Sequence, residues 1–116
     1  MFAIFLAACS SKSYSPQAKF IFGNTKIDSA EARRVLHNFS IENNLFFHDS
    51  SHKYPSGTKT LLAVAKGADG LQVILGEAGE GDKLMVSIHC HEECQHWEEA
   101  YSSVQSKFKE RWEIAE

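Results

Sequence analysis

The chain has 116 residues, of which 43% are hydrophobic and 23% are charged, and this size and composition predict one globular domain. Its formal net charge is -3, and Lys and Arg are scattered rather than striped, so we expect no nucleic-acid partner. No apolar run approaches the ~20 residues of a membrane-spanning helix, and no dinucleotide or phosphate-loop motif predicts a cofactor.

The first segment, MFAIFLAACSSKSYSPQ, passes from an apolar run to small residues and then to Cys9. This order is typical of a secretory signal and its cleavage site. The stretch LAAC, Leu6 to Cys9, resembles the lipobox of bacterial lipoproteins, and the resemblance covers only the start of the chain. It implies a signal peptide remnant at residues 1–8, cleavage before Cys9, and membrane attachment through a lipid anchor on that cysteine.

The polar residues that follow resemble the flexible tether of such lipoproteins, so we assign residues 9–18 to a tether and residues 19–116 to the folded domain. Ser10 resembles the sorting pattern for the outer membrane, which implies a protein that faces the periplasm. No Lys or Arg precedes the apolar run, so we expect a complete signal to begin upstream of Met1. The alternative is that the apolar run forms a short buried segment and that Cys9 is an ordinary thiol.

The first predicted element of the domain is AKFIF, residues 18–22, which is either a short strand or an extended lead-in, because a turn signal follows it. Residues 27–44 predict a helix that begins at a capping box of Asp28 and Glu31 and stops at a pair of asparagines. The apolar stripe of this helix consists of Ala32, Val35, Leu36 and Phe39.

Four strands are predicted next, at residues 45–49, 60–66, 71–75 and 83–89. In the last strand Leu84, Val86 and Ile88 alternate with more polar residues and therefore share one face. Short connections between the later strands favour antiparallel neighbours.

Residues 94–112 predict the clearest helix, with acidic residues near its start and basic residues near its end, as the helix dipole favours. Its apolar stripe consists of Trp97, Tyr101, Val104 and Phe108. The order helix, strands, helix predicts an α+β fold, with a four-stranded antiparallel sheet and both helices packed on one face.

Two stretches between these elements contain residue types that occur in catalytic sites. HDSSHKY, residues 48–54, offers His48, Asp49, Ser50, Ser51 and His52. A Ser-His-Asp triad requires a base within hydrogen-bond reach of the nucleophile, and no G-x-S-x-G elbow occurs, so we interpret this stretch as a polar loop. GEAGEGD, residues 76–82, is acidic and lacks the Lys-Ser/Thr ending of a phosphate loop, so we interpret it as a hairpin turn.

The densest chemical stretch is HCHEECQHW, residues 89–97. Cys90 continues the inward alternation of the last strand, and Cys94 continues the inward stripe of the last helix. In an exported protein disulfides form and persist, and with Cys9 lipidated two cysteines remain. We therefore predict a Cys90–Cys94 disulfide, and free buried thiols are the alternative.

The histidines of the same stretch, His89, His91 and His96, are predicted to be mainly solvent-facing. Imidazole and thiolate suit zinc or copper, so a site of these histidines with Cys94 or Glu92 is chemically possible. The stretch lacks the paired C-x₂-C and H-x₃-H blocks that make zinc sequences specific.

The sequence as a whole favours a small lipid-anchored envelope protein that acts by binding or as structure, with no catalytic residue and no cofactor. A metal-binding lipoprotein that uses His89, His91 and His96 is the alternative, and a hydrolase built on the Ser-His-Asp types of residues 48–52 is a third hypothesis. No motif identifies a protein or small-molecule ligand.

Overall fold

The computed structural model describes residues 16–50, 61–78, 82–91 and 94–115. Several residues of the sequence predictions lie outside these ranges, namely Leu6 to Cys9, Ser10, Ser51, His52 and Glu92. The described part of the chain has an α+β fold of two helices and one sheet. Neither helix in this part is long and apolar enough to cross a membrane.

The sheet has six strands, all antiparallel to their neighbours, in the order β2-β3-β4-β5-β1-β6. The strands are β1 (Ala18–Phe22), β2 (Phe46–Asp49), β3 (Leu61–Lys66), β4 (Leu71–Glu77), β5 (Leu84–Cys90) and β6 (Ile114–Ala115). The four predicted strands correspond to β2, β3, β4 and β5, and they pair in chain order.

The predicted number of four strands is wrong, because β1 and β6 extend the sheet beyond β5. Phe20 of β1 pairs with Val86 of β5, and Phe22 pairs with both Leu84 and Ile114. These partners are far apart in the sequence, so no local pattern identifies them. Pairing with β1 supplies hydrogen-bond partners to an edge of β5 that the predicted sheet left unpaired.

The first helix, α2 (Thr25–Glu42), begins earlier than predicted. Asn24 is its N-cap, and the Asn24 side chain accepts a hydrogen bond from the Lys26 N–H at 2.9 Å. The Asp28 carboxylate accepts from the Asn24 N–H at 2.9 Å, which closes the capping arrangement. The predicted box of Asp28 and Glu31 is therefore placed too late, since Asp28 is the partner of the cap rather than the cap itself. The predicted apolar stripe is confirmed, because all four of its residues are buried.

The second helix, α3 (Trp97–Lys109), begins three residues later than predicted. Val104 and Phe108 are fully buried, whereas Trp97 and Tyr101 are only partly buried against the core. The Tyr101 hydroxyl donates a hydrogen bond to the Lys19 carbonyl oxygen at 3.0 Å. Tyrosine commonly keeps its polar end at the boundary between core and solvent. The stripe of α3 therefore faces the sheet, but at the start of the helix it lies at the edge of the core.

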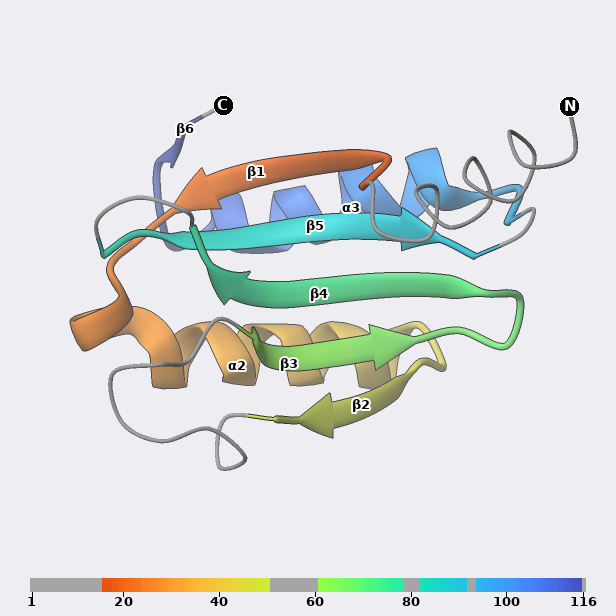
Figure 1. Cartoon of the computed structure of the whole chain (residues 1–116), viewed down its shortest axis with the longest axis horizontal. Helices are drawn as coiled ribbons and strands as arrows, with labels where there is room; N and C mark the ends of the chain where they lie inside the picture. The colour runs from red at the N-terminus through yellow and green to blue at the C-terminus, as the bar shows by residue number, and fades with distance from the viewer. Residues whose placement is uncertain (1–15, 51–60, 79–81, 92–93, 116) are drawn as a thin grey trace, which may run out of the picture.

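Both helices cover the same face of the sheet, as predicted, and in Figure 1 they lie behind it. The largest fully buried side chains on the strands that they cover are Phe20, Phe22, Val73, Leu75, Leu84, Val86 and Ile88. The other sheet face, which no helix in the described part of the chain covers, is called the open face here. One row across the open face runs through His48, Val64, Ile74, Ser87 and Lys19.

Candidate functional site

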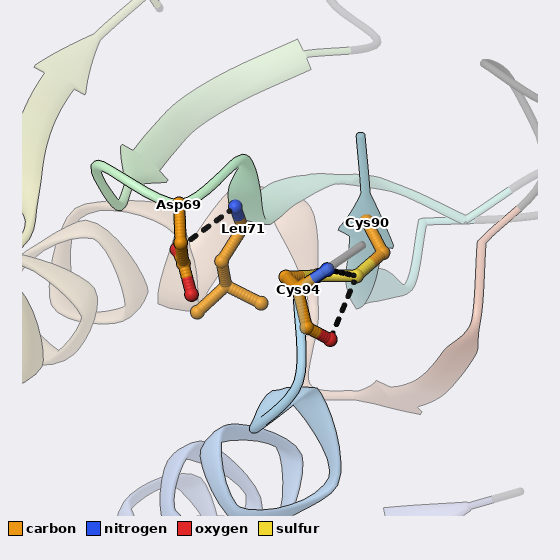
Figure 2. Close-up of a disulfide and its surroundings, with 4 residues drawn as sticks. All are labelled: Asp69, Leu71, Cys90 and Cys94. Atoms are coloured by element: carbon orange, nitrogen blue, oxygen red, sulfur yellow. Dashed lines mark hydrogen bonds between the residues drawn. A yellow bond between two sulfur atoms is a disulfide. The ribbon is translucent and has the colours of Figure 1, made fainter. Parts of the chain in front are cut away.

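The candidate site is the corner where β5 ends and α3 begins. Cys90 is the last residue of β5, and Cys94 lies three residues before the first residue of α3. The two sulfur atoms are joined as a disulfide, and the Cα atoms are 5.7 Å apart (Figure 2). This Cα separation lies within the ~4.4–6.8 Å that a disulfide requires. The fold thus brings together the pair that the sequence predicts, and its redox state in the cell stays a prediction.

The two cysteines differ in burial. Cys94 is 4% exposed and belongs to the hydrophobic core, whereas Cys90 is half-buried at the edge of that core. The Cys94 N–H donates a hydrogen bond to the Cys90 Sγ at 3.2 Å. Both side chains face the core side of the sheet, as the alternation predicts, but only the Cys94 side chain is sealed from solvent.

The turn between β3 and β4 is hydrogen-bonded to this corner. The Gly70 carbonyl oxygen accepts a hydrogen bond from the His91 N–H at 2.9 Å. Gly70 has a φ of +94°, and a Cβ at this position would lie only 2.3 Å from the His91 carbonyl oxygen. Figure 2 shows the same turn, in which the Asp69 carboxylate accepts from the Leu71 N–H at 3.3 Å. Sequence reasoning identified the turn but not its contact with the corner, because Gly70 and His91 are 21 positions apart in the chain.

The histidines of the corner have three different surroundings. His89 lies on the open face, half-buried, with its Nε2 3.0 Å from the Ser87 hydroxyl. Burial disfavours the charged imidazolium and lowers the pKa of His89 below its ordinary value. His91 is exposed beside the turn, and His96 is the N-cap residue of α3, with its Nδ1 3.1 Å from a Glu99 carboxylate oxygen.

The predicted alternative metal ligands therefore do not form a cluster. Among the residues that the structure describes, no group of three or more histidine, cysteine, aspartate or glutamate side chains could hold a metal ion. Cys94 is engaged in the disulfide, and metal binding requires a thiolate. The prediction that the histidines are mainly solvent-facing fits His91 and His96, while His89 is more enclosed.

The candidate triad types of residues 48–50 fall on and beside the edge strand β2. His48 and Asp49 are adjacent strand residues, so their side chains point to opposite faces of the sheet. Asp49 lies 3.6 Å from the Arg33 guanidinium of α2. Ser50 is buried, and its N–H donates to the Leu62 carbonyl oxygen at 2.9 Å. These three residues are therefore not arranged as a triad, and the rest of the predicted polar loop lies outside the described residues.

A cavity of about 370 Å³ opens near the corner, at the junction of the two helices. Its apolar lining residues are Phe39, Leu45, Leu71 and Ala100, and its polar lining residues are Asn43, His96, Glu99 and Ser103. The volume falls in the range of small-ligand pockets, roughly 300–1,000 Å³. Sequence reasoning missed this cavity because its lining residues come from separate elements.

Comparison with known proteins gives no relative for this chain: no protein-family model, no curated protein and no solved structure matches it.

Proposed function

We propose that this chain is a small lipid-anchored protein of the cell envelope, attached at Cys9 to the outer membrane and facing the periplasm. The observation that supports the proposal is the Cys90–Cys94 pair, whose Cα atoms are 5.7 Å apart, a separation that a disulfide can span. Disulfides form and persist in oxidising compartments such as the periplasm. This support comes from a part of the chain that is independent of the LAAC stretch, and it agrees with the export that LAAC implies.

Within the envelope, we propose that the domain acts by binding rather than by catalysis. The cavity at the junction of α2 and α3 combines an apolar side with a few polar groups, which is the usual make-up of a small-molecule site. The disulfide fixes the segment that leads into α3, and this segment carries His96 to the wall of the cavity. No contact in the described residues favours the metal-binding alternative, so we do not propose it.

The anchor is tested by expressing the chain behind a complete signal in a Gram-negative host. Stable anchoring requires more than one acyl chain, because a single chain gives only marginal binding. The wild-type protein is expected to partition into detergent and to carry the acyl mass on Cys9, and Cys9→Ser should move it to the aqueous phase. Ser11→Ala is the matched control, because it alters the same segment and leaves the cysteine in place. A wild-type chain that stays in the aqueous phase with Met1 intact would contradict the proposal.

A further inference from the structure

We infer that the Cys90–Cys94 disulfide is an exchange site, at which Cys90 forms a mixed disulfide with the dithiol of a partner protein. The starting observation is the unequal burial of the two sulfur-bearing residues. Cys94 is 4% exposed and packed in the core, while Cys90 is half-buried at the end of β5. An attacking thiolate approaches along the line of the sulfur–sulfur bond, so access decides which sulfur it reaches. The geometry makes Cys90 the sulfur that an external thiol attacks.

The backbone of Cys94 offers partners to the Cys90 sulfur in either redox state. Its N–H lies 3.2 Å from the Cys90 Sγ and stabilises negative charge there, as on a thiolate. Its carbonyl oxygen lies 3.3 Å from the same sulfur and can accept a hydrogen bond from the neutral thiol. The start of α3 follows three residues later, with the positive end of the helix dipole directed at this segment. Cys90 therefore keeps hydrogen-bond partners after the disulfide opens.

The fold does not depend on the disulfide for its core. The bridge spans a sequence separation of only four residues, and a disulfide that closes so short a loop constrains the unfolded chain little. The core is formed mainly by aromatic and aliphatic side chains of β1, β4, β5 and both helices. Reduction should therefore free the corner while the domain stays folded, which is what reversible exchange requires.

Each step of the exchange forms one sulfur–sulfur bond and breaks another. A thiolate of the partner attacks the Cys90 Sγ, a new sulfur–sulfur bond forms, and the Cys90–Cys94 bond breaks. Its electron pair goes to the Cys94 Sγ, which takes up a proton. The second thiolate of the partner then attacks the mixed disulfide and releases Cys90 as a thiolate, so the partner is oxidised and this pair is reduced. In the reverse direction Cys94 is the resolving thiol.

The inference rests on the proposed function only for the compartment that keeps the pair oxidised. The difference in reactivity between Cys90 and Cys94 is a property of the fold, and it can be measured on a chain without its lipid. A full-length chain with Cys9→Ser is the suitable background, because it leaves only these two sulfurs able to react.

The first experiment treats this oxidised chain with reduced glutathione, blocks free thiols with N-ethylmaleimide in acid, and locates both groups by fragment mass spectrometry. We expect glutathione on Cys90 and the maleimide on Cys94, with at least about a tenfold preference for this arrangement. Glutathione mainly on Cys94, or equally on both cysteines, would overturn the inference. If the wild-type chain is lipidated but Cys90 and Cys94 react equally, the proposed function stands and the exchange inference fails.

The second experiment compares the two single thiols in the folded state. In the Cys94→Ser chain Cys90 should react with an aromatic disulfide reagent about tenfold faster or more than Cys94 does in the Cys90→Ser chain. Both variants should react at similar rates in urea, where burial no longer differs. Circular dichroism establishes that each variant is folded, and if one is not, the wild-type measurement above still decides the question. Equal rates in two folded variants would contradict the inference.

Discussion

At the scale of single residues, Gly70 determines how closely the β3–β4 turn approaches the disulfide corner. Its φ of +94° suits glycine, and an added Cβ would meet the His91 carbonyl oxygen at 2.3 Å. Gly70→Ala is therefore expected to lower the free energy of unfolding by about 1–3 kcal/mol or more, through backbone strain and the displaced His91. Urea denaturation measures this loss. Ala68→Ser, an exposed change in the same turn, should stay within about 0.5 kcal/mol of wild type, and similar losses in both would show that the close contact is unimportant.

His89 couples the stability of the domain to pH. Burial lowers its pKa in the folded protein, so below the unfolded-state value of about 6.5 the unfolded chain binds the proton more readily than the folded one. The stabilisation is therefore complete above about pH 6.5 and is lost as the pH falls through that value toward the lower folded pKa. We expect the free energy of unfolding of wild type to fall relative to that of His89→Gln between about pH 7.5 and pH 5. Gln95→Ala, an exposed change that removes no titratable group, gives the control and should keep the wild-type pH dependence. Parallel curves for wild type and His89→Gln would refute the assignment.

At the scale of elements, the buried part of α3 lies in its C-terminal half. Val104 and Phe108 are fully buried, and Phe108 packs edge-on against Phe20 and Phe22 of β1. Phe108→Ala should cost about 3–5 kcal/mol. Ser102→Ala, on the exposed side of the same helix, should cost under about 0.5 kcal/mol. Thermal or urea unfolding distinguishes these values, and a loss from Trp97→Ala as large as that from Phe108→Ala would mean that the helix start is more buried than the structure shows.

Some features of the helices and strands could be predicted from the sequence, and others could not. The apolar stripe of α2, the inward direction of Cys90 and Cys94, and the pairing of β2 to β5 all follow from local periodicity and short connections. The place of β1 does not follow, because its residues pair with β5 more than 60 positions later in the chain. The cavity between the helices depends on how α2 and α3 meet, and no pattern within either helix specifies that. The N-cap at Asn24 was available from the sequence, since asparagine is a favoured cap, but Asp28 and Glu31 also match a capping box, and this match placed the helix start too late.

At the scale of the whole molecule, the direction of β1 fixes which end of the domain faces an anchor at Cys9. The Gln17 N–H donates to the Ile88 carbonyl oxygen at 2.7 Å, so the chain enters the sheet beside the end of β5 that carries the corner. The covalent chain from Cys9 to Gln17 reaches at most roughly 26–29 Å. The opposite end of β5, at Leu84, is six residues from Cys90, which corresponds to roughly 19–20 Å along the strand, and it adjoins the start of α2. With a lipid at Cys9, we therefore expect the corner end to lie on average nearer the membrane than the α2 end.

This orientation is measurable by energy transfer from a dye on the protein to acceptor lipids in vesicles that hold the anchored chain. Ala68→Cys places a dye on the exposed β3–β4 turn at the corner end, and Lys83→Cys places it on the exposed residue directly before β5, at the far end. Labelling without reductant leaves the disulfide intact, and the lipid occupies Cys9. We expect stronger transfer from position 68 than from position 83, because the tether enters beside the corner and the two positions are separated by the length of β5. The matched control is the same pair of labelled chains with Cys9→Ser, which should show little transfer at either position. Equal transfer from both positions in the anchored chain would mean that the domain has no preferred end toward the membrane, and the reverse order would place the anchor at the other end.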